Sequence, residues 1–206
     1  MMLPSRLTLA AAALLAPMLF ATGSPAKAET ERWVIDESHA SIGFMVDHIG
    51  FARVLGMFLE IDGSFDYDPA TMHLAGGQVT IPVASVFTNH DKRDEHLRDP
   101  DFFDSETHPY MVFTATGFEP TGAQQGRLSG TLDLLGRRNP VTLDVTINRI
   151  DEYPFSPGLF RARPYVLGAS LRGTLRRSDW GMDYGVSDGL VGDEVELILE
   201  LEARRQ

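Results

Sequence analysis

Apolar and polar residues alternate along most of this chain, and this two-residue period constrains the fold more than any other feature of the sequence. Successive side chains of a β-strand point to opposite faces of a sheet, so alternation is typical of strands with one buried face and one face in water. The pattern predicts eight strands, which fall at residues 42–46, 58–68, 79–83, 111–115, 128–134, 141–147, 169–175 and 195–201.

Clusters of Gly, Pro, Asn and Asp separate several of the predicted strands, as at residues 66–72, 118–126, 134–141 and 153–158. These are the residue types that tight turns require. Many strands joined by turns, without helices regularly placed between them, are typical of an antiparallel sandwich or barrel. We find no internal repeat and no linker, so the sequence predicts one all-β domain.

The first 28 residues have the order of a secretory signal peptide. Arg6 precedes an uncharged run over residues 7–20, and the small residues Ala26 and Ala28 flank Lys27 at the expected cleavage site. We expect cleavage after Ala28, which leaves residues 29–206 as the exported domain. No later stretch approaches the roughly 18 uninterrupted apolar residues that a membrane span needs, so we expect a soluble protein.

Charge and cysteine content exclude two classes of function. The chain has 29 acidic and 18 basic residues, and nucleic acids are bound mainly by clustered Lys and Arg, so a nucleic-acid partner is not expected. There is no cysteine, which rules out disulfides and thiol chemistry. The stability of the fold must therefore come from a continuous apolar core.

Two segments break the alternation. In residues 47–56 the apolar residues have mixed spacing, which suggests a helical turn that covers one end of a barrel. In the second segment Thr88 or Asn89 can act as an N-cap, and Asp91 completes a capping-box pattern with Thr88. Pro100 marks the end of this segment, so the sequence predicts a short capped helix before it.

The side chains of this short helix raise a metal-site hypothesis. His90 and Asp94 lie four residues apart, which is one helical turn, and His96 follows closely. The helical zinc signature needs two histidines four residues apart, whereas His90 and His96 are six apart and face different directions. We therefore expect no metal, and we interpret Arg93 and Asp94 as residues that fix the helix to the barrel by hydrogen bonds. No nucleophile with an adjacent base is indicated, so neither catalysis nor a cofactor is expected.

From Trp33 to its end, the chain resembles the YceI-like family of exported proteins, which bind polyisoprenoids or other lipids in a lipocalin-like barrel. Within the helical segment the resemblance rests on Asn89, Arg93, Asp94, His96 and Leu97, followed by Phe102 and Phe103. The other matching segments are residues 33–51, 108–118, 130–145 and 193–203. One departure is the turn in which Arg137 and Arg138 stand where the family more usually has a small hydroxyl residue before Pro140.

The resemblance implies an extended eight-stranded antiparallel lipocalin-like β-barrel with one or two short helices and a long apolar lumen. The function that it implies is a carrier in the periplasm, or secreted further, which holds an isoprenoid lipid, another long-chain lipid or a quinone without catalysis. A homodimer is one assembly to consider. The alternative function is an exported metal-dependent hydrolase that uses His90, Asp94 and His96.

Inward-facing strand positions supply the candidate ligand-binding residues. Each is equally well interpreted as an ordinary core residue. Phe58 does not fit the alternation of its own predicted strand, because Leu59 and Ile61 lie on the opposite face from Phe58 in a regular strand. The residues expected to line the lumen are Ile42, Phe44, Val46, Phe51, Phe58, Phe113, Leu132, Val145 and Leu171.

Whether this lumen is open depends on small residues along the same faces. A barrel of eight strands is just wide enough to be filled by its own side chains or to hold one small ligand. Gly130, Ala169 and Gly173 leave room for a ligand, or the glycines only relieve crowding where strands bend. The sequence fits both interpretations.

Charged residues near a mouth would meet the ligand's head group. His48 and Arg53, with Arg93, are candidates for this contact, although His48 and Arg53 equally fit a role in capping the barrel end. The net charge of −11 opposes a pyrophosphate head unless local arginines overcome it. A neutral head group, such as a quinone or an alcohol, is therefore expected at least as readily as a pyrophosphate.

Overall fold

The structure is a computed structural model that describes residues 30–156, 158–159 and 161–206. The predicted signal peptide lies outside these residues. The strands are β1 (Glu31–His48), β2 (Ala52–Phe58), β3 (Asp62–Asp68), β4 (His73–Pro82), β5 (Val86–Phe87), β6 (Tyr110–Pro120), β7 (Gln125–Leu134), β8 (Arg137–Glu152), β9 (Tyr165–Arg176) and β10 (Val191–Arg205). The helices are α1 (Asp91–Arg98) and the 3-10 turns η1 (Val83–Ser85) and η2 (Arg177–Trp180).

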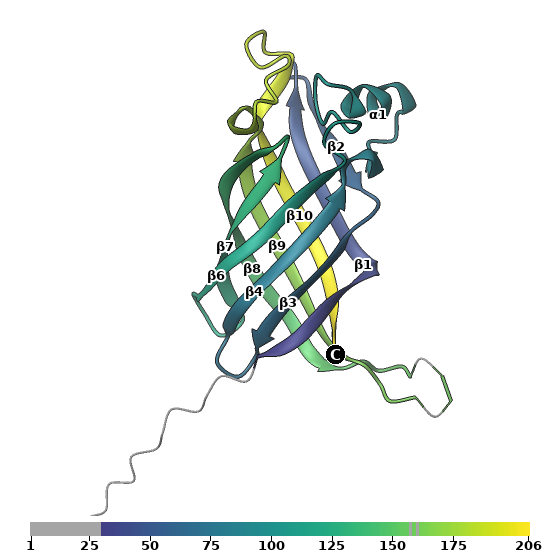
Figure 1. The fold of residues 1–206 in the computed structure, drawn as a ribbon, viewed down its shortest axis with the longest axis vertical. Coiled ribbons are helices and arrows are strands. Elements are labelled where there is room, and N and C mark those ends of the chain that lie inside the picture. The colour runs from purple at the N-terminus through teal and green to yellow at the C-terminus, as the bar shows by residue number, and fades with distance from the viewer. Residues whose placement is uncertain (1–29, 157, 160) are drawn as a thin grey trace, which may run out of the picture.

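Eight of the strands form a closed antiparallel barrel (Figure 1). In ring order these are β1, β3, β4, β6, β7, β8, β9 and β10, and the pairing of β10 with β1 closes the ring. The predicted eight-stranded antiparallel barrel is thus confirmed. No helix in the described part of the chain has the length and apolar character needed to cross a membrane.

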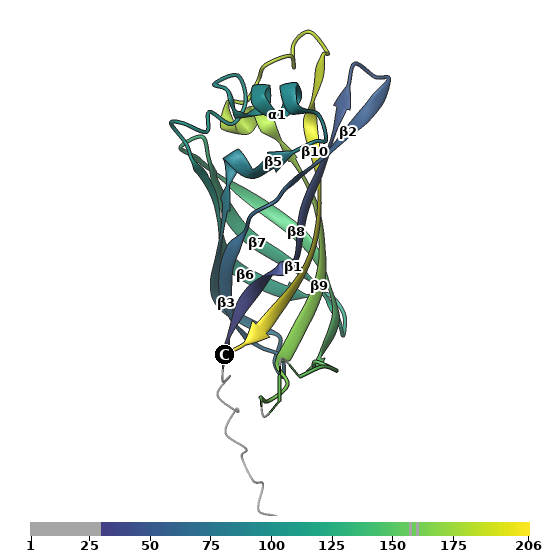
Figure 2. The same ribbon diagram turned by 90° about the vertical axis from the view of Figure 1, so that its right-hand side faces the viewer.

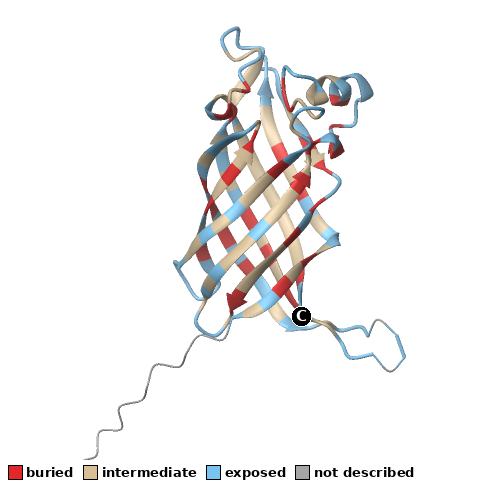
Figure 3. Cartoon of the chain, in the orientation of Figure 1, coloured by how far each residue is buried: buried red, intermediate tan, exposed pale blue. Residues whose placement is uncertain are grey.

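The alternation of the sequence becomes the inner and outer faces of the barrel wall. On β8, Val141, Leu143, Val145 and Ile147 are buried, whereas the residues between them are exposed. Figure 3 shows buried and exposed positions following one another along the strands. The buried apolar residues of all eight barrel strands join in one cluster in the interior, which is where a ligand site would lie.

Strand β1 changes partner part of the way along its length. Its first residues, 31–34, pair with β3, and its last residues, 42–48, pair with β2 instead. On its other side β1 pairs with β10 almost throughout. As a result, the hairpin formed by β1 and β2 leaves β3 at the upper end while β1 stays paired with β10, and Figure 2 shows the hairpin projecting there.

The expectation of a helical turn over residues 47–56 is wrong, because this segment is the β1–β2 hairpin. Its turn is at Ile49 and Gly50, with φ angles of 56° and 69°, and the amide of Phe51 donates to the carbonyl of His48 (3.1 Å). Two successive positive φ angles are typical of a type I′ hairpin turn, where Asn or Gly is usual and a β-branched residue is rare. Ile49 therefore hid the turn signal.

The predicted strand over residues 58–68 is divided into two. β2 ends at Phe58 and β3 begins at Asp62, and the bend between them turns Leu59 outward, where it is 63% exposed. Because of this bend, both Phe58 and Ile61 face the interior although they lie an odd number of residues apart. The break between the two strands therefore explains how Phe58 can face the interior together with Ile61.

The seam between β1 and β10 is crossed by ion pairs. A bulge in β1 between Ile35 and Ala40 turns the carboxylate of Asp36 towards Arg204 (2.5 Å), while Ser38 Oγ donates to the same carboxylate (2.6 Å). Burial acts to raise the pKa of Asp36, but hydrogen bonds from Ser38 and His39 and the charge of Arg204 lower it to about 2. The ionised carboxylate therefore stabilises the closed barrel.

We expect Asp36→Asn to lower the free energy of unfolding by about 2 kcal/mol at neutral pH, from the fall in pKa from 3.8 to about 2. Since the folded-state pKa is the lower one, this stability is present above pH 3.8 and is lost as the pH falls through about 2. Urea titrations at several pH values should show the two proteins converging in acid. The control is Asp151→Asn, because the Asp151–Arg149 pair is exposed and should contribute little. A constant difference between wild type and Asp36→Asn at all pH values would contradict the assignment.

Candidate functional site

A cavity of about 280 Å³ lies inside the barrel. Its wall is formed by residues from every barrel strand, together with Leu97, Phe102 and Phe103 from α1 and the segment after it, and Met182 from the segment after η2. The surface that this wall presents to the cavity is entirely apolar. Such a surface suits a hydrocarbon.

The cavity is long and narrow. On β10 its wall runs from Val191 to Leu201, ten residues apart. At about 3.3 Å per residue and a strand tilt of about 40°, this distance corresponds to roughly 25 Å along the barrel axis. An extended chain of several isoprene units fits a space of these proportions better than a compact ligand does.

Glycines keep the barrel axis open by making room for rings along the wall. A Cβ atom added to Gly56 would lie 2.2 Å from Cζ of Phe44, and one added to Gly130 would lie 2.2 Å from Cζ of Phe113. Each ring therefore covers a glycine on the adjacent strand, an arrangement that lets large side chains pack against a sheet. At Gly130 the ring of Phe113 takes this space, which fits the interpretation that the glycine relieves crowding.

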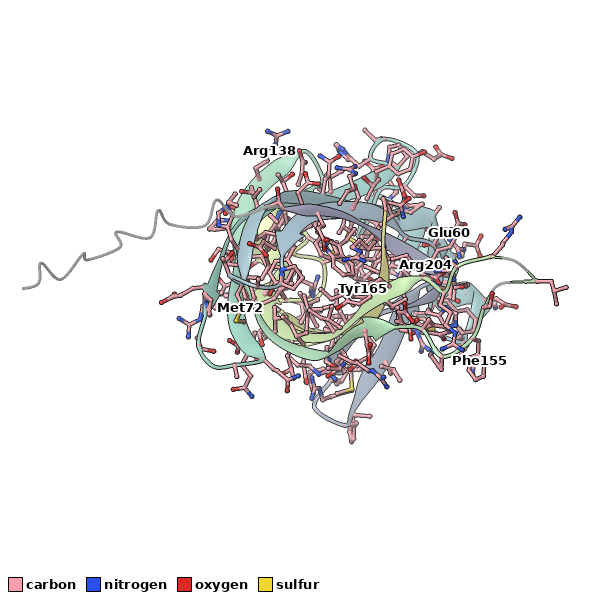
Figure 4. All side chains as sticks on the ribbon, turned by 90° about the horizontal axis from the view of Figure 1, so that it is seen from below. Glu60, Met72, Arg138, Phe155, Tyr165 and Arg204 are labelled. Atoms are coloured by element: carbon pink, nitrogen blue, oxygen red, sulfur yellow. The ribbon has the colours of Figure 1, made fainter. Side chains whose placement is uncertain are left out.

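Aromatic side chains pack across the lower end of the barrel. Trp33 is fully buried, its Nε1 donates to the carbonyl of Tyr67 (3.2 Å), and its ring stacks on that of Phe65. Tyr165 lies against the other side of Trp33 and under the guanidinium of Arg205. Figure 4, which views this end from below, shows side chains filling the ring of strands, with Tyr165 near its centre.

A second cavity, of about 320 Å³, lies at the upper end, and we call it the vestibule. It shares part of its wall with the barrel cavity, so the two cavities lie next to each other. The shared residues are Phe44, Val46, Leu97, Phe102 and Val191. The remaining vestibule residues are Asp47, His48, Ile49, Val54, Arg93, His96, Tyr184 and Leu190. The vestibule wall is thus richer in polar and charged side chains than the wall of the barrel cavity.

Helix α1 forms one side of the vestibule and is fixed by its own polar residues. Its N-cap is His90, whose Nδ1 accepts from the amide of Arg93 (3.3 Å), and not Thr88 or Asn89 as predicted. Thr88 instead donates its amide to the buried carboxylate of Asp94 (2.8 Å). Arg93 donates through Nε to Thr88 Oγ1 (2.7 Å). Arg93 and Asp94 thus have a structural role, but their bonds fix the helix to the segment before it and not to a barrel strand as predicted.

The structure does not bring together the three residues of the metal hypothesis. His90 caps the helix, Asp94 binds Thr88, and His96 contacts Asp101 (3.1 Å) and the ring of Tyr184. In the described part of the chain, one group of three potential ligands has atoms close enough to share an ion, and it consists of Asp36, His39 and Glu202. This group lies on the β1–β10 seam, where Arg204 is already paired with Asp36.

The structure places the predicted ligand-binding residues in three different settings. His48 lines the vestibule, whereas Phe51 is 91% exposed just after the hairpin turn, and Arg53 faces outward in an ion pair with Glu196. Phe51 and Arg53 therefore do not line the lumen, because the hairpin turns both outside the barrel. The residues that do lie on the cavity wall are Ile42, Phe44, Val46, Phe58, Phe113, Leu132, Val145 and Leu171.

Several residues of the cavity wall are not among the ligand-binding residues predicted from the sequence. Leu97, Phe102 and Phe103 belong to the helical segment, and their inward position depends on how α1 packs over the barrel. Val195, Leu197, Leu199 and Leu201 alternate in a predicted strand, so the sequence already contained the signal that identifies them.

Comparison with known proteins shows similarity over nearly the whole described region. The sequence pattern of the YceI-like domain matches residues 33–203. A UPF0312 protein of Azotobacter vinelandii is 33% identical over 201 residues, which cover 97% of this chain and 98% of the relative.

Two solved structures show the same fold. The YCEI protein of Campylobacter jejuni superposes with a TM-score of 0.69 at 30% identity, covering 78% of this chain and 90% of that protein. A domain of Saccharophagus degradans, described as polyisoprenoid binding, has a TM-score of 0.60 at 15% identity and covers 84% of this chain and 98% of its own. The barrel, its apolar cavity and these similarities lead to one assignment: the chain belongs to the YceI-like family.

Proposed function

We propose that this chain is a periplasmic, non-catalytic carrier that holds one long-chain isoprenoid lipid or quinone in the barrel cavity. The observation that carries the proposal is the long apolar wall of the barrel cavity, whose upper end lies next to the vestibule. The polyisoprenoid-binding domain of Saccharophagus degradans, which shares the fold, supports this choice of ligand.

Apolar burial alone can provide the affinity of such a carrier. A five-carbon isoprene unit gains about 4 kcal/mol on full burial, at about 0.8 kcal/mol per carbon, before the costs of ordering the chain. Several units along the cavity therefore suffice for firm binding. The eight predicted residues on the cavity wall would contact the chain, and His48 would contact the ligand in the vestibule.

The head group in this proposal is uncharged, as in a quinone or an alcohol. The two arginines nearest the mouth already have partners, since Arg53 pairs with Glu196 (2.5 Å) and Arg93 binds the hydroxyl and the carbonyl of Thr88 (2.7 Å each). The net charge of −11 also opposes the approach of a pyrophosphate.

A series of prenols of increasing length tests this proposal. We expect the affinity to rise at least about tenfold per isoprene unit and to level off once the chain exceeds the roughly 25 Å of cavity, because further units stay in water. Displacement of a fluorescent apolar probe measures the affinities. Affinity that does not depend on chain length would contradict a carrier with an apolar lumen.

Residues 1–28 are proposed to direct export and to be removed after Ala28. Fractionation of the native cells should place the protein, with Glu29 as its first residue, in the periplasmic fraction. An uncleaved protein in the cytoplasm would contradict this location. A carrier of this kind can act as a monomer or as a homodimer, which sedimentation of the purified protein distinguishes.

A further inference from the structure

The loop between β8 and β9 projects beyond the lower end of the barrel (Figure 1). It spans residues 153–164, and the view from below shows Phe155 outside the ring of strands (Figure 4). Phe155 is 72% exposed and Leu159 is 86% exposed. Single exposed apolar side chains are common on protein surfaces, whereas several in one segment are typical of an interaction surface. The β8–β9 loop is therefore a candidate docking element.

The β8–β9 loop is also basic, although the chain as a whole has a net charge of −11. It contains Arg161 and Arg163 and no Asp or Glu. Both arginines are exposed, and no ion pair among the described residues involves either of them. The nearest acidic residues in the sequence are Asp151, which pairs with Arg149 (2.6 Å), and the exposed Glu152 at the base of the loop. The loop thus combines exposed apolar side chains with two positive charges of its own.

Contacts at its base hold the loop in place. The amide of Tyr153 donates to the carbonyl of Pro164 (2.7 Å), which closes the loop, and Ser156 Oγ lies 2.7 Å from each of two loop carbonyls. The ring of Tyr153 lies near those of Phe155 and of His39 on β1, with ring centroids 6.2 and 6.5 Å apart. An ordered loop loses little conformational freedom when it binds a partner, and this favours docking.

We propose that the β8–β9 loop docks the protein on an anionic lipid bilayer. Phe155 and Leu159 insert at the level of the headgroups, and Arg161 and Arg163 pair with lipid phosphates. This activity goes beyond the proposed carrier function and does not rest on it. The acidic barrel opposes docking only weakly, because salt at physiological ionic strength screens charges more than about 8 Å apart, whereas the arginines lie in the contact itself.

The side chains of the loop match the two layers of a bilayer that they would meet. Aromatic and aliphatic side chains bury their apolar surface at the boundary of headgroups and acyl chains. Each Arg near an anionic membrane surface strengthens binding several-fold, and a guanidinium binds a phosphate through two parallel hydrogen bonds. The loop is also a projection (Figure 1), which a bilayer takes up without a preformed pocket. A bilayer therefore suits it better than a protein partner does.

The exposed apolar residues at the upper end of the barrel do not have this combination. Phe51 is 91% exposed and Leu55 is 62% exposed, but Arg53 between them is paired with Glu196. The same hairpin carries Asp47, which an anionic surface repels. The lower end is therefore the one that an anionic bilayer attracts. In this orientation the vestibule, at the opposite end, stays turned away from the membrane.

Cosedimentation of the purified protein with lipid vesicles tests the proposal. One set of vesicles contains phosphatidylglycerol and phosphatidylcholine in equal parts, and the other contains phosphatidylcholine alone. The wild type should bind the anionic vesicles at least about tenfold more tightly than the neutral ones. The double variant Arg161→Gln/Arg163→Gln should lose this preference. The double variant Phe155→Ser/Leu159→Ser should bind the anionic vesicles at least about tenfold more weakly than the wild type.

The matched control is the double variant Phe51→Ser/Leu55→Ser, which removes the same types of exposed side chain at the upper end. It should bind both kinds of vesicle as the wild type does. Circular dichroism should be unchanged in the three variants, because all six positions are exposed. Both loop variants should keep the prenol affinity of the wild type, since the loop is not part of the cavity wall.

Three results would overturn the proposal. The first is a wild-type protein that does not sediment with anionic vesicles, which would leave a protein partner as the use of the loop. The second is equal binding to anionic and neutral vesicles. The third is vesicle binding that survives in both loop variants or is lost in the control. Because vesicle binding is measured without a prenol, failure of the carrier function would not affect these outcomes.

Discussion

An Ala115→Trp variant is expected to keep the barrel fold and to bind a long-chain prenol at least about a hundredfold more weakly than the wild type. Ala115 lies on the cavity wall near the middle of β6, where it pairs with Gly77 on one side and Gly130 on the other. An indole at this position would take the space of about one isoprene unit, whose burial gains about 4 kcal/mol before ordering costs.

The matched control for this variant is Thr114→Trp. Thr114 precedes Ala115 on the same strand and is exposed on the outer face, so the same side chain is added outside the lumen. Circular dichroism and binding should both be unchanged in the control. Equal affinities in wild type, control and Ala115→Trp would mean that the ligand does not occupy the barrel interior.

Replacement of Arg177 by methionine is expected to lower the free energy of unfolding by roughly 3 kcal/mol or more, which corresponds to a fall in Tm of about 6–12 °C. Arg177 is 3% exposed, and its guanidinium donates to the carbonyls of Met182, Tyr184, Val191 and Gly192 at 2.7–2.9 Å. Without the guanidinium, these carbonyls lose their donor in a buried setting. Because Met182 and Val191 belong to the cavity wall, prenol binding should weaken as well.

The neighbouring Arg176 provides the control. Its guanidinium is exposed and pairs with Asp193 (3.0 Å), so Arg176→Met should cost no more than about 1 kcal/mol. Arg177→Lys should behave like Arg177→Met, since an ammonium group cannot supply the fork of donors that the carbonyls require. Thermal unfolding followed by circular dichroism measures all three. An Arg177→Met protein as stable as Arg176→Met would contradict the role assigned to the buried guanidinium.

The strands could be predicted from the sequence because alternation determines which residues face inward. On β8, the inward series from Val141 to Ile147 was correct at each position. The prediction failed at the hairpin turn of Ile49 and Gly50, because a β-branched residue such as Ile49 rarely has a positive φ and so gave no turn signal beside the glycine. It also failed at Phe51, since an exposed aromatic residue beside a turn has the same sequence signature as a buried one.

The openness of the cavity could not be predicted, because it depends on register between strands. Whether the ring of Phe44 points to the barrel axis or covers Gly56 is decided by their pairing across β1 and β2. The alternation over residues 169–175 does place Arg177, and not Arg176, on the inward face, but it does not indicate which carbonyls the buried guanidinium binds.

Native mass spectrometry of the protein, purified without detergent from its own cells, tests the carrier account most directly. We predict a species heavier than the polypeptide by the mass of one chain lipid, which organic extraction releases, and a polypeptide mass that begins at Glu29. A protein that carries only a stoichiometric metal ion, or that has the bare polypeptide mass and takes up no prenol when one is added, would contradict the account.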